Sequence, residues 1–403
     1  MTTIITTSAG PTNSIRTRYG ATYLRAAQAE RVYEQLCYPV EKHGIEKACE
    51  LGETIQINML QDIPRGTTAI PQTTDVEPVT ISDVTATITT TSRWVAVKEA
   101  ERVKLDVYTN WANEKVYAVG KASKETLDLM AQNAALQGSF VIRAAARASL
   151  DAGSTGHYWT DEAVNQAYST LLSMKVPPFM GNGRNQYFCI AHTDVLHDLR
   201  LQGNVKDVAV YQDKEIIMDF ELGQIGPFKI IATPMAKVFW GAGSARSTSF
   251  STTLGTAITA LSSGKTLTAA SSTNLDHSVW VNICDTVETG DTHYDTNERV
   301  RYISNSGAVL TYRGEGANGS NRWAHATTAT LNNSDSVYPV AYGGPQSIAK
   351  AWASSVGEFG TMVEKVDGLL NQFQSLGFKW YGGYGMFNDT YCIRGEYSCS
   401  LQA

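Results

Sequence analysis

Residues 53–152 combine two periodicities, and together they restrict strongly what this chain can fold into. Glu53–Leu60 and Val79–Val97 alternate apolar and polar residues and are rich in β-branched side chains, which indicates two strands. The segment between them, Gln61–Pro78, contains three prolines. An extended β-hairpin with a proline-rich tip is therefore predicted. A plain hairpin that packs on its own domain is the alternative.

Residues 109–152 then follow the period of a helix, without a proline. Thr109 or Asn110 can cap its start, and Gly153 ends it. As a single helix it would be about 60 Å long, although Gly120 and Gly138 can divide it. A hairpin and a helix of this length exceed the needs of one small domain, so we expect other surfaces to cover them.

The rest of the chain alternates and then becomes β-rich. After a possible helix at Thr22–Cys37, the central elements are a helix at Asp161–Val176 capped by Thr160, a strand at Tyr187–Ala191, a helix at Thr193–Leu201, and strands at Phe228–Ile231 and Ala236–Trp240. Residues 243–336 are rich in Thr, Ser, Gly and Asn, which predicts a small all-β module with strands at Lys265–Ala269, Val279–Cys284, Arg299–Ser304 and Ala308–Arg313. Two β-rich runs, Gly377–Tyr384 and Tyr391–Ser398, flank a turn at Asn388-Asp389.

The composition indicates a surface that neighbours cover. Of the 403 residues 43% are hydrophobic and only 18% are charged, against about 25% charged in ordinary soluble domains. Interface cores are depleted in charge. The net charge of −6 argues against a protein that grips nucleic acid over its whole surface.

The six cysteines are scattered and form no C-x-x-C pair, so reduced thiols in a cytoplasm are expected. Residues 1–10 lack the basic and apolar regions of a signal peptide. No apolar run approaches the roughly 20 residues of a membrane span, so no membrane partner is expected.

Three passages carry a resemblance to a known family. They are Gly226–Pro234 with Ala236–Gly243, the run from Gly377 to Arg394, and the hairpin-to-helix passage Val79–Gly153. Together with the order of the elements, they resemble the major capsid proteins of tailed bacteriophages, which have the Hong Kong 97 type fold. The sequence also resembles the N4-type family of these proteins. The resemblance covers about three quarters of the chain, and residues 243–336 depart from the minimal pattern.

The resemblance implies an α+β capsid fold with named parts. These are an N-terminal arm (1–50), an extended loop (51–98), a peripheral domain with a spine helix (99–154), an axial domain (155–228), a peripheral strand (229–242), a β-rich insertion (243–336), an axial return (337–376) and C-terminal peripheral strands (377–403).

The resemblance also implies a function in the virion. Copies of the chain would assemble in the host cytoplasm as pentamers and hexamers of an icosahedral shell that encloses double-stranded DNA without specific binding. The implied partners are the chain itself, a portal protein and, as a further candidate, a decoration protein. The arm is too short for a built-in coiled-coil scaffold, so a separate scaffolding protein is expected.

Some relatives join a loop lysine covalently to a neighbour's asparagine. Residues 51–97 contain no lysine, and the arginines there, Arg65 and Arg93, cannot act as amine nucleophiles at neutral pH. We therefore predict no cross-link through this loop.

No catalytic, cofactor or metal site is predicted, and the chain is not expected to be an enzyme. Ser263–Thr266 resembles the end of a phosphate loop but lacks the required first glycine, so a turn is favoured. His192 and His197 lie five residues apart near a helix start, where a polar helix surface is favoured over zinc binding. The acidic loop at Asp285, Glu288, Asp291 and Asp295 is interpreted as solvated, with a hard cation as the alternative.

The candidate intersubunit contacts are Arg16, Arg18, Ile63, Arg65, Ile70, Arg93, Trp94, Arg143 and Arg147. Arg143 and Arg147 would pair with acids of a neighbour or face packaged DNA, and a solvated face or one with ion pairs inside the subunit is at least as well supported. A phage tail or head-decoration protein is the structural rival. A surface hydrolase is the enzymatic rival, although no nucleophile or carboxylate pair supports it.

Overall fold

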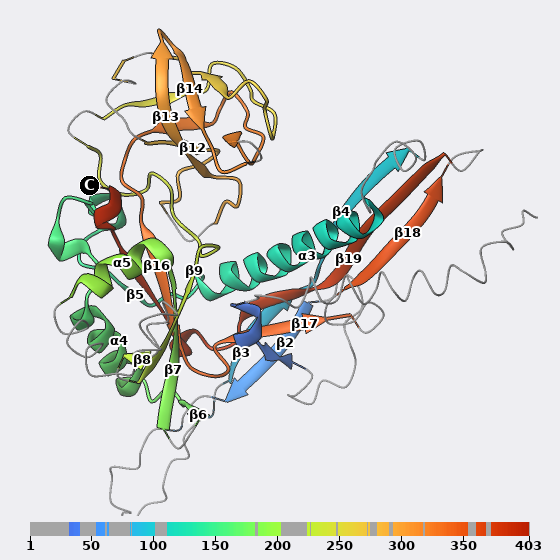
Figure 1. Cartoon of the computed structure of the whole chain (residues 1–403). Coiled ribbons are helices and arrows are strands. Elements are labelled where there is room, and N and C mark those ends of the chain that lie inside the picture. The colour runs from blue at the N-terminus through green and yellow to red at the C-terminus, as the bar shows by residue number, and fades with distance from the viewer. Residues whose placement is uncertain are drawn as a thin grey trace, which may run out of the picture. The chain divides into compact units, whose positions relative to one another are not determined.

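The computed structural model describes residues 32–40, 54–60, 63, 81, 83–100, 111–181, 184–202, 224–225, 227–246, 249–271, 273–274, 280–289, 293–316, 319–353, 360–367 and 372–402. The chain divides into two compact units (Figure 1). The first unit comprises residues 1–135 and 346–388, and the second comprises residues 136–345 and 389–403. Both units combine helices and strands, as the predicted α+β class requires.

The predicted hairpin is confirmed in the first unit. Strands β2 (Thr54–Leu60) and β3 (Asp83–Thr89) pair antiparallel along their whole length. Ile55, Ile57 and Ile88 are buried in a cluster with two alanines of β17 (Ile348–Trp352). The described base of the hairpin therefore packs on its own unit. Of the segment 61–82 only Ile63 and Ile81 are described.

The second predicted strand of the hairpin is two strands in the structure. β3 ends at Thr89, and β4 (Thr91–Ala100) leaves β2 to pair antiparallel with β19 (Phe373–Met386). The polypeptide thus changes sheets at the buried Thr90. The sheet that β4 joins also contains β1 (Tyr38–Pro39), β17 and β18 (Thr361–Asp367), in the order β1-β17-β19-β18.

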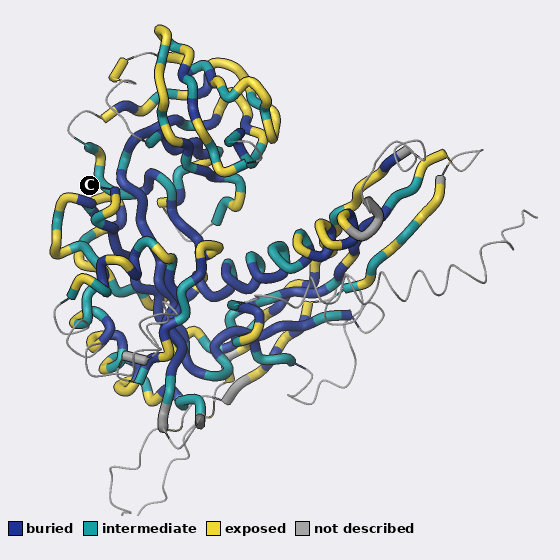
Figure 2. Tube along the Cα trace, in the orientation of Figure 1, coloured by how far each residue is buried: buried dark blue, intermediate teal, exposed yellow. Residues whose placement is uncertain are grey.

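Helix α3 (Trp111–Ala135) lies along this sheet. Val116, Val119 and Leu127 pack with side chains of β19 in one buried cluster, and the helix has the same buried stripe in Figure 2. The helix is about 37 Å long at 1.5 Å per residue. Because β19 belongs to the same unit, α3 finds its cover within its own unit. The expectation that the long helix needs a neighbour's cover is wrong for this face.

The prediction that the helix continues to residue 152 is wrong. After α3 the chain passes Gly138, enters β5 (Val141–Ile142) and forms a 3₁₀ turn at Arg147–Ser149. Tertiary contacts override the helical spacing here, because β5 pairs in parallel with β20 (Cys392–Tyr397) of the second unit.

The second unit contains a seven-stranded sheet in the order β5-β20-β16-β7-β9-β8, with β6 paired to β7. Its remaining strands are β6 (Phe179–Gly181), β7 (Arg184–His192), β8 (Gln224–Ile225), β9 (Phe228–Thr233) and β16 (Tyr338–Gly343). Helices α4 (Asp161–Ser173) and α5 (Thr193–Leu201) pack on it. Both helices were predicted, and the Thr160 hydroxyl caps α4 by accepting from the Ala163 amide at 3.3 Å.

The predicted strand at Ala236–Trp240 is wrong. Only an isolated bridge joins Phe239 to Val337, because the chain turns after Thr233 at Pro234. The Lys237 side chain is instead used in an ion pair with Glu288.

The last two long strands belong to different units, whereas the sequence placed residues 377–403 in one part. β19 pairs with β4, β17 and β18 in the first unit, and β20 pairs with β16 and β5 in the second. β17 and β18 likewise lie in the first unit, although residues 337–376 were expected to stay together. The apolar alternation of each strand is visible in the sequence, but the choice of partner strand is not.

The β-rich module predicted between 243 and 336 is confirmed as a six-stranded sheet within the second unit, and we call it the insertion. Its strands are β10 (Ser251–Thr253), β11 (Thr266–Thr268), β12 (Trp280–Cys284), β13 (Glu298–Ser306), β14 (Val309–Arg313) and β15 (Thr330–Asn332). It has a buried cluster of its own, which includes Val281, Val300 and Leu331. The remaining 3₁₀ turns are Glu34–Leu36, Thr155–His157, Asp389–Tyr391 and Ser400–Gln402.

Candidate assembly surfaces

The sheet formed by β4, β19 and β18 has a second face, which β3 covers only near Gly383 and Gly385 of β19 among the described residues. Leu376, Phe378 and Trp380 point toward α3, so the alternate residues of the three strands lie on the opposite side. We call this side the open sheet face and define it by Trp94, Ala96, Lys98, Val363, Lys365, Phe373 and Lys379.

Large apolar side chains are exposed on the open sheet face. Trp94 is 72% exposed, Val363 42% and Phe373 40%. Contiguous exposed apolar surface marks interaction sites in soluble proteins. Trp94 was predicted as a contact from the sequence. Val363 and Phe373 were missed, because residues 337–376 were assigned elsewhere, although the exposed alternation at Thr361, Val363 and Lys365 is present in the sequence.

Lysines surround these apolar residues. Lys365 and Lys98 face the same position of β19, Ser375, from the two neighbouring strands. The ammonium of Lys98 lies 4.6 Å from the centre of the Phe373 ring. The open sheet face therefore offers apolar side chains interspersed with lysines, which suits a partner that carries both carboxylates and apolar residues.

Of the other contacts predicted for the first unit, two are exposed and four lie outside the described residues. Ile63 is 61% exposed, and Arg93 is exposed on β4 opposite Trp380. Arg16, Arg18, Arg65 and Ile70 lie outside the described residues, so their roles stay predictions. Ile81, which was not predicted, is 57% exposed near the end of the hairpin.

Arg147 is a buried ion-pair partner within the subunit, which is the alternative that the sequence left open. Its guanidinium donates to both oxygens of Glu396, a residue without exposed surface, and one of these bonds, from Nε to Oε2, measures 3.1 Å. The Arg143 guanidinium, partly exposed, also donates to Glu396 at 3.1 Å. Arg394 lies 3.0 Å from the same carboxylate.

This arrangement determines the charge state of Glu396. Burial alone would raise the pKa of its carboxyl group, but the hydrogen bonds and charge of Arg147, with the charges of Arg394 and Arg143, hold the pKa below its usual value. A carboxylate whose ionised form is favoured thus joins the segment after α3 to β20. The cluster stabilises the second unit and is not an assembly contact at Arg147.

The motifs considered for chemistry have structural roles. The His192 ring accepts a hydrogen bond from the Asp194 amide at 3.1 Å and so caps α5. Lys265 has a positive φ of 49° in a turn before β11, in agreement with the predicted turn.

The acidic loop pairs with basic side chains instead of being fully solvated. Glu288 and Asp295 lie 3.1 and 3.4 Å from the ammonium of Lys237. Asp285 lies 3.0 Å from the ring of His325, which also lies 2.8 Å from Glu298. Asp291 is outside the described residues. Among the described residues, no group of three or more His, Cys, Asp or Glu side chains could hold a metal ion.

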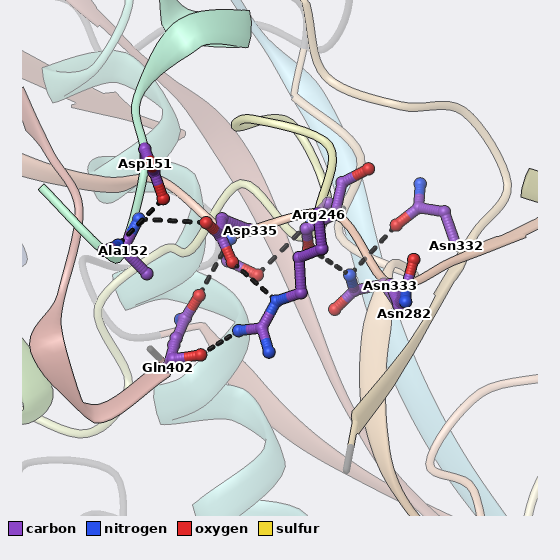
Figure 3. A network of polar contacts seen from close by, with 12 residues as sticks. Asp151, Ala152, Arg246, Asn282, Asn332, Asn333, Asp335 and Gln402 are labelled. Atoms are coloured by element: carbon purple, nitrogen blue, oxygen red, sulfur yellow. Dashed lines mark hydrogen bonds and ion pairs between the residues drawn. The ribbon is translucent and has the colours of Figure 1, made fainter. Parts of the chain in front are cut away.

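A polar network links the base of the insertion to the C-terminal turn (Figure 3). Arg246 donates to Asp335 at 2.9 Å and to the carbonyl of Gln402, and Asp335 also accepts from the Ala152 amide. The small cavity beside Arg246 measures ≈ 10 Å³. That is room for about one water molecule and not for a substrate.

No helix in the described part of the chain is long and apolar enough to cross a membrane.

Comparisons with known proteins gave matches only among solved structures. No family model matches the chain, and no curated protein matches it. The capsid of Ralstonia phage GP4 has a TM-score of 0.49 and 10% identity, over 87% of this chain and 84% of that chain. The cyanophage Pam1 capsid asymmetric unit has a TM-score of 0.49 and 12% identity, over 87% and 86%. The acidic stable capsid of Helicobacter pylori bacteriophage KHP30 has a TM-score of 0.48 and 9% identity, over 86% and 85%. At these values the similarities do not by themselves assign a family.

Proposed function

We propose that this chain is the major capsid protein of a tailed bacteriophage, with a Hong Kong 97 type fold and membership of the N4-type family. In this proposal many copies form the pentamers and hexamers of an icosahedral head around double-stranded DNA. The observation that carries it is the open sheet face, where Trp94, Val363 and Phe373 are 72%, 42% and 40% exposed on one side of the sheet. Burial of this apolar surface by a neighbouring copy lowers the free energy of the assembly.

The order of the parts supports the same proposal. A hairpin with an exposed Ile63 beyond β2, a helix on a long sheet, an α/β sheet and a β insertion follow one another as the resemblance implies. In the proposed shell, residues 1–50 and 51–98 are the arm and the extended loop, and both contact neighbouring copies. The part boundaries follow the sequence, with residues 346–388 reassigned to the unit that contains α3.

The proposed partners follow from this role. The chain assembles with itself, with a separate scaffolding protein and with a portal protein, and a decoration protein is a further candidate. DNA is held by enclosure, in keeping with a net charge of −6.

The test is assembly of the purified chain, with and without the scaffolding protein, followed by electron microscopy. Closed shells or capsomers are expected, and Trp94→Glu should leave a folded chain that no longer assembles. Tyr117→Glu is the matched control, because this aromatic residue is 56% exposed on α3, away from the open sheet face. Trimers or tubes would contradict the proposal, as would normal shells from Trp94→Glu.

The proposed shell is non-covalent at residues 51–97, because this part of the chain contains no lysine. Mature particles boiled in SDS should release this chain as a monomer. A ladder of covalent multimers would contradict this part.

A head-decoration or tail protein is the second candidate, favoured by one observation. The insertion has its own buried cluster, so it could act as a binding module. Rings or trimers that bind preformed heads, without shells, would favour this candidate.

A further inference from the structure

The outer face of the β13–β14 hairpin holds two arginines in an unusual arrangement. Arg301 and Arg313 are directly opposite each other in the antiparallel register. Side chains in such positions start about 5 Å apart, and like charges there destabilise a sheet. Neither arginine forms an ion pair or hydrogen bond with a described residue, and the exposed Glu315 nearby pairs with neither.

The surroundings hold this pair in place. The stem of Arg313 packs on Gly319, where an added Cβ would lie 3.0 Å from the Arg313 Cγ. Gly319 also has a positive φ of 79°, which side chains rarely adopt. The absence of a side chain at Gly319 therefore leaves room for the Arg313 stem.

Aromatic residues support the other side of the pair. Trp280 is directly opposite Arg301 on β12. The guanidinium of Arg299 lies 4.5 Å from the centre of the Trp280 ring. The same guanidinium also lies 4.6 Å from the centre of the Trp240 ring. Arg299 has Asp194 at 3.9 Å, so its charge is partly compensated. We call Trp280, Arg299, Arg301 and Arg313 the arginine patch.

Two exposed aliphatic residues lie further along the same hairpin, between the arginine pair and the turn. Ile303, at the irregular register of β13, is 57% exposed, and Val309 is 41% exposed on β14. Val309 and Arg313 alternate with the buried Leu310 and Tyr312, so they share the outer face. A nucleic-acid backbone would use the charges but not the aliphatic side chains, whereas a polypeptide with carboxylates and apolar residues uses both.

We propose that the arginine patch binds an acidic segment of a protein partner. Carboxylates of the partner lie between Arg301 and Arg313, where they relieve the repulsion, and an apolar side chain covers Ile303 and Val309. Charge complementarity selects this partner, since arginine forks bind carboxylates with two hydrogen bonds. The inference does not depend on the shell proposal, because it concerns the insertion alone.

The test measures binding of a fluorescent peptide of alternating glutamate and leucine to the full chain. A glutamine-and-leucine peptide is the control ligand. Arg301→Ala and Arg313→Ala should each weaken binding by about tenfold or more, since each removes charge-assisted hydrogen bonds. Lys229→Ala is the matched control, because it removes one positive charge from an exposed strand position outside both the insertion and the open sheet face.

A stability readout separates binding from folding. Arg313→Ala should leave the thermal midpoint unchanged or raise it, because it removes a like-charge neighbour. Equal peptide binding by all variants would overturn the proposal. Tighter binding of a short DNA duplex than of the acidic peptide would also overturn the proposal. The same holds if the arginine variants change only the self-association of the chain.

Discussion

Glu396 and Arg147 are 249 residues apart in the sequence and meet in a buried ion pair, in which the guanidinium donates to both carboxylate oxygens. Glu396 has no exposed surface, and Arg147 is 5% exposed. The contact joins the segment that follows α3 to strand β20.

Glu396→Gln should lower the free energy of unfolding of the second unit by about 3–5 kcal/mol, because breaking a buried pair leaves arginines without a counter-charge. Chemical denaturation followed by tryptophan fluorescence measures this. Glu162→Gln is the control, since Glu162 is exposed on α4. Equal midpoints for the two variants would show that the cluster is not stabilising.

The same pair predicts a pH dependence. The pKa of Glu396 is lower in the folded chain than in the unfolded chain, so its contribution is present above the unfolded pKa of about 4.3. It is lost as the pH falls through the folded pKa. Wild type should therefore lose more stability than Glu396→Gln on acidification below about pH 4.

The Asp128 carboxylate accepts hydrogen bonds from the amides of Val32, Tyr33 and Glu34, at 3.0, 2.8 and 3.1 Å. It therefore anchors this segment to α3. Asp128→Asn should weaken the anchor by about 1.5–3 kcal/mol, because the three amides then bond to a neutral amide oxygen instead of a charged carboxylate. Hydrogen exchange at these three amides should accelerate.

Glu114→Gln, an exposed position on the same helix, is the control for Asp128→Asn and should leave this exchange unchanged. Unchanged exchange in Asp128→Asn would mean that the segment is held by other contacts.

Local patterns in the sequence predicted local elements well. α5 was predicted with its observed bounds, and α4 with its Thr160 cap, because capping residues and helical spacing lie within a few positions. The open sheet face was found only at Trp94. Its other members come from β18 and β19, and strand pairing depends on residues hundreds of positions away.

The end of the long helix shows the same limit. Val141, Ala145 and Ala148 continue its apolar spacing, yet β5 pairs with β20 and Arg147 with Glu396. The carboxylate that decides the position of Arg147 lies near the C-terminus. The spacing of apolar residues in one segment cannot predict a contact with a residue so far away in the sequence.

His325 is buried between Glu298 and Asp285, at 2.8 and 3.0 Å. Burial alone would lower the pKa of its ring, but the hydrogen bonds and charges of the two carboxylates raise it. Its contribution to stability is complete below the unfolded pKa of about 6.5 and is lost as the pH rises through the folded pKa.

The thermal midpoint of the insertion should therefore fall as the pH rises above about 6.5. His325→Gln should lower the midpoint at acidic pH and flatten this dependence. His197→Gln is the control, since its side chain is 47% exposed. A wild-type midpoint that rises through the same pH range would contradict the raised pKa.

Gly377 is required where β19 passes β4. An added Cβ would lie 2.7 Å from the Val95 carbonyl oxygen and 2.8 Å from the Ala96 Cβ. The backbone cannot move away from such a contact without opening the strand pairing, so Gly377→Ala should lower the free energy of unfolding by about 1–3 kcal/mol.

The control is Gly156→Ala. At Gly156 an added Cβ meets nothing within 4 Å, so this variant should be neutral or slightly stabilising. Because β4 and β19 both carry the open sheet face, Gly377→Ala should also reduce assembly in proportion to its loss of stability. Full stability with lost assembly would instead assign Gly377 to the contact itself.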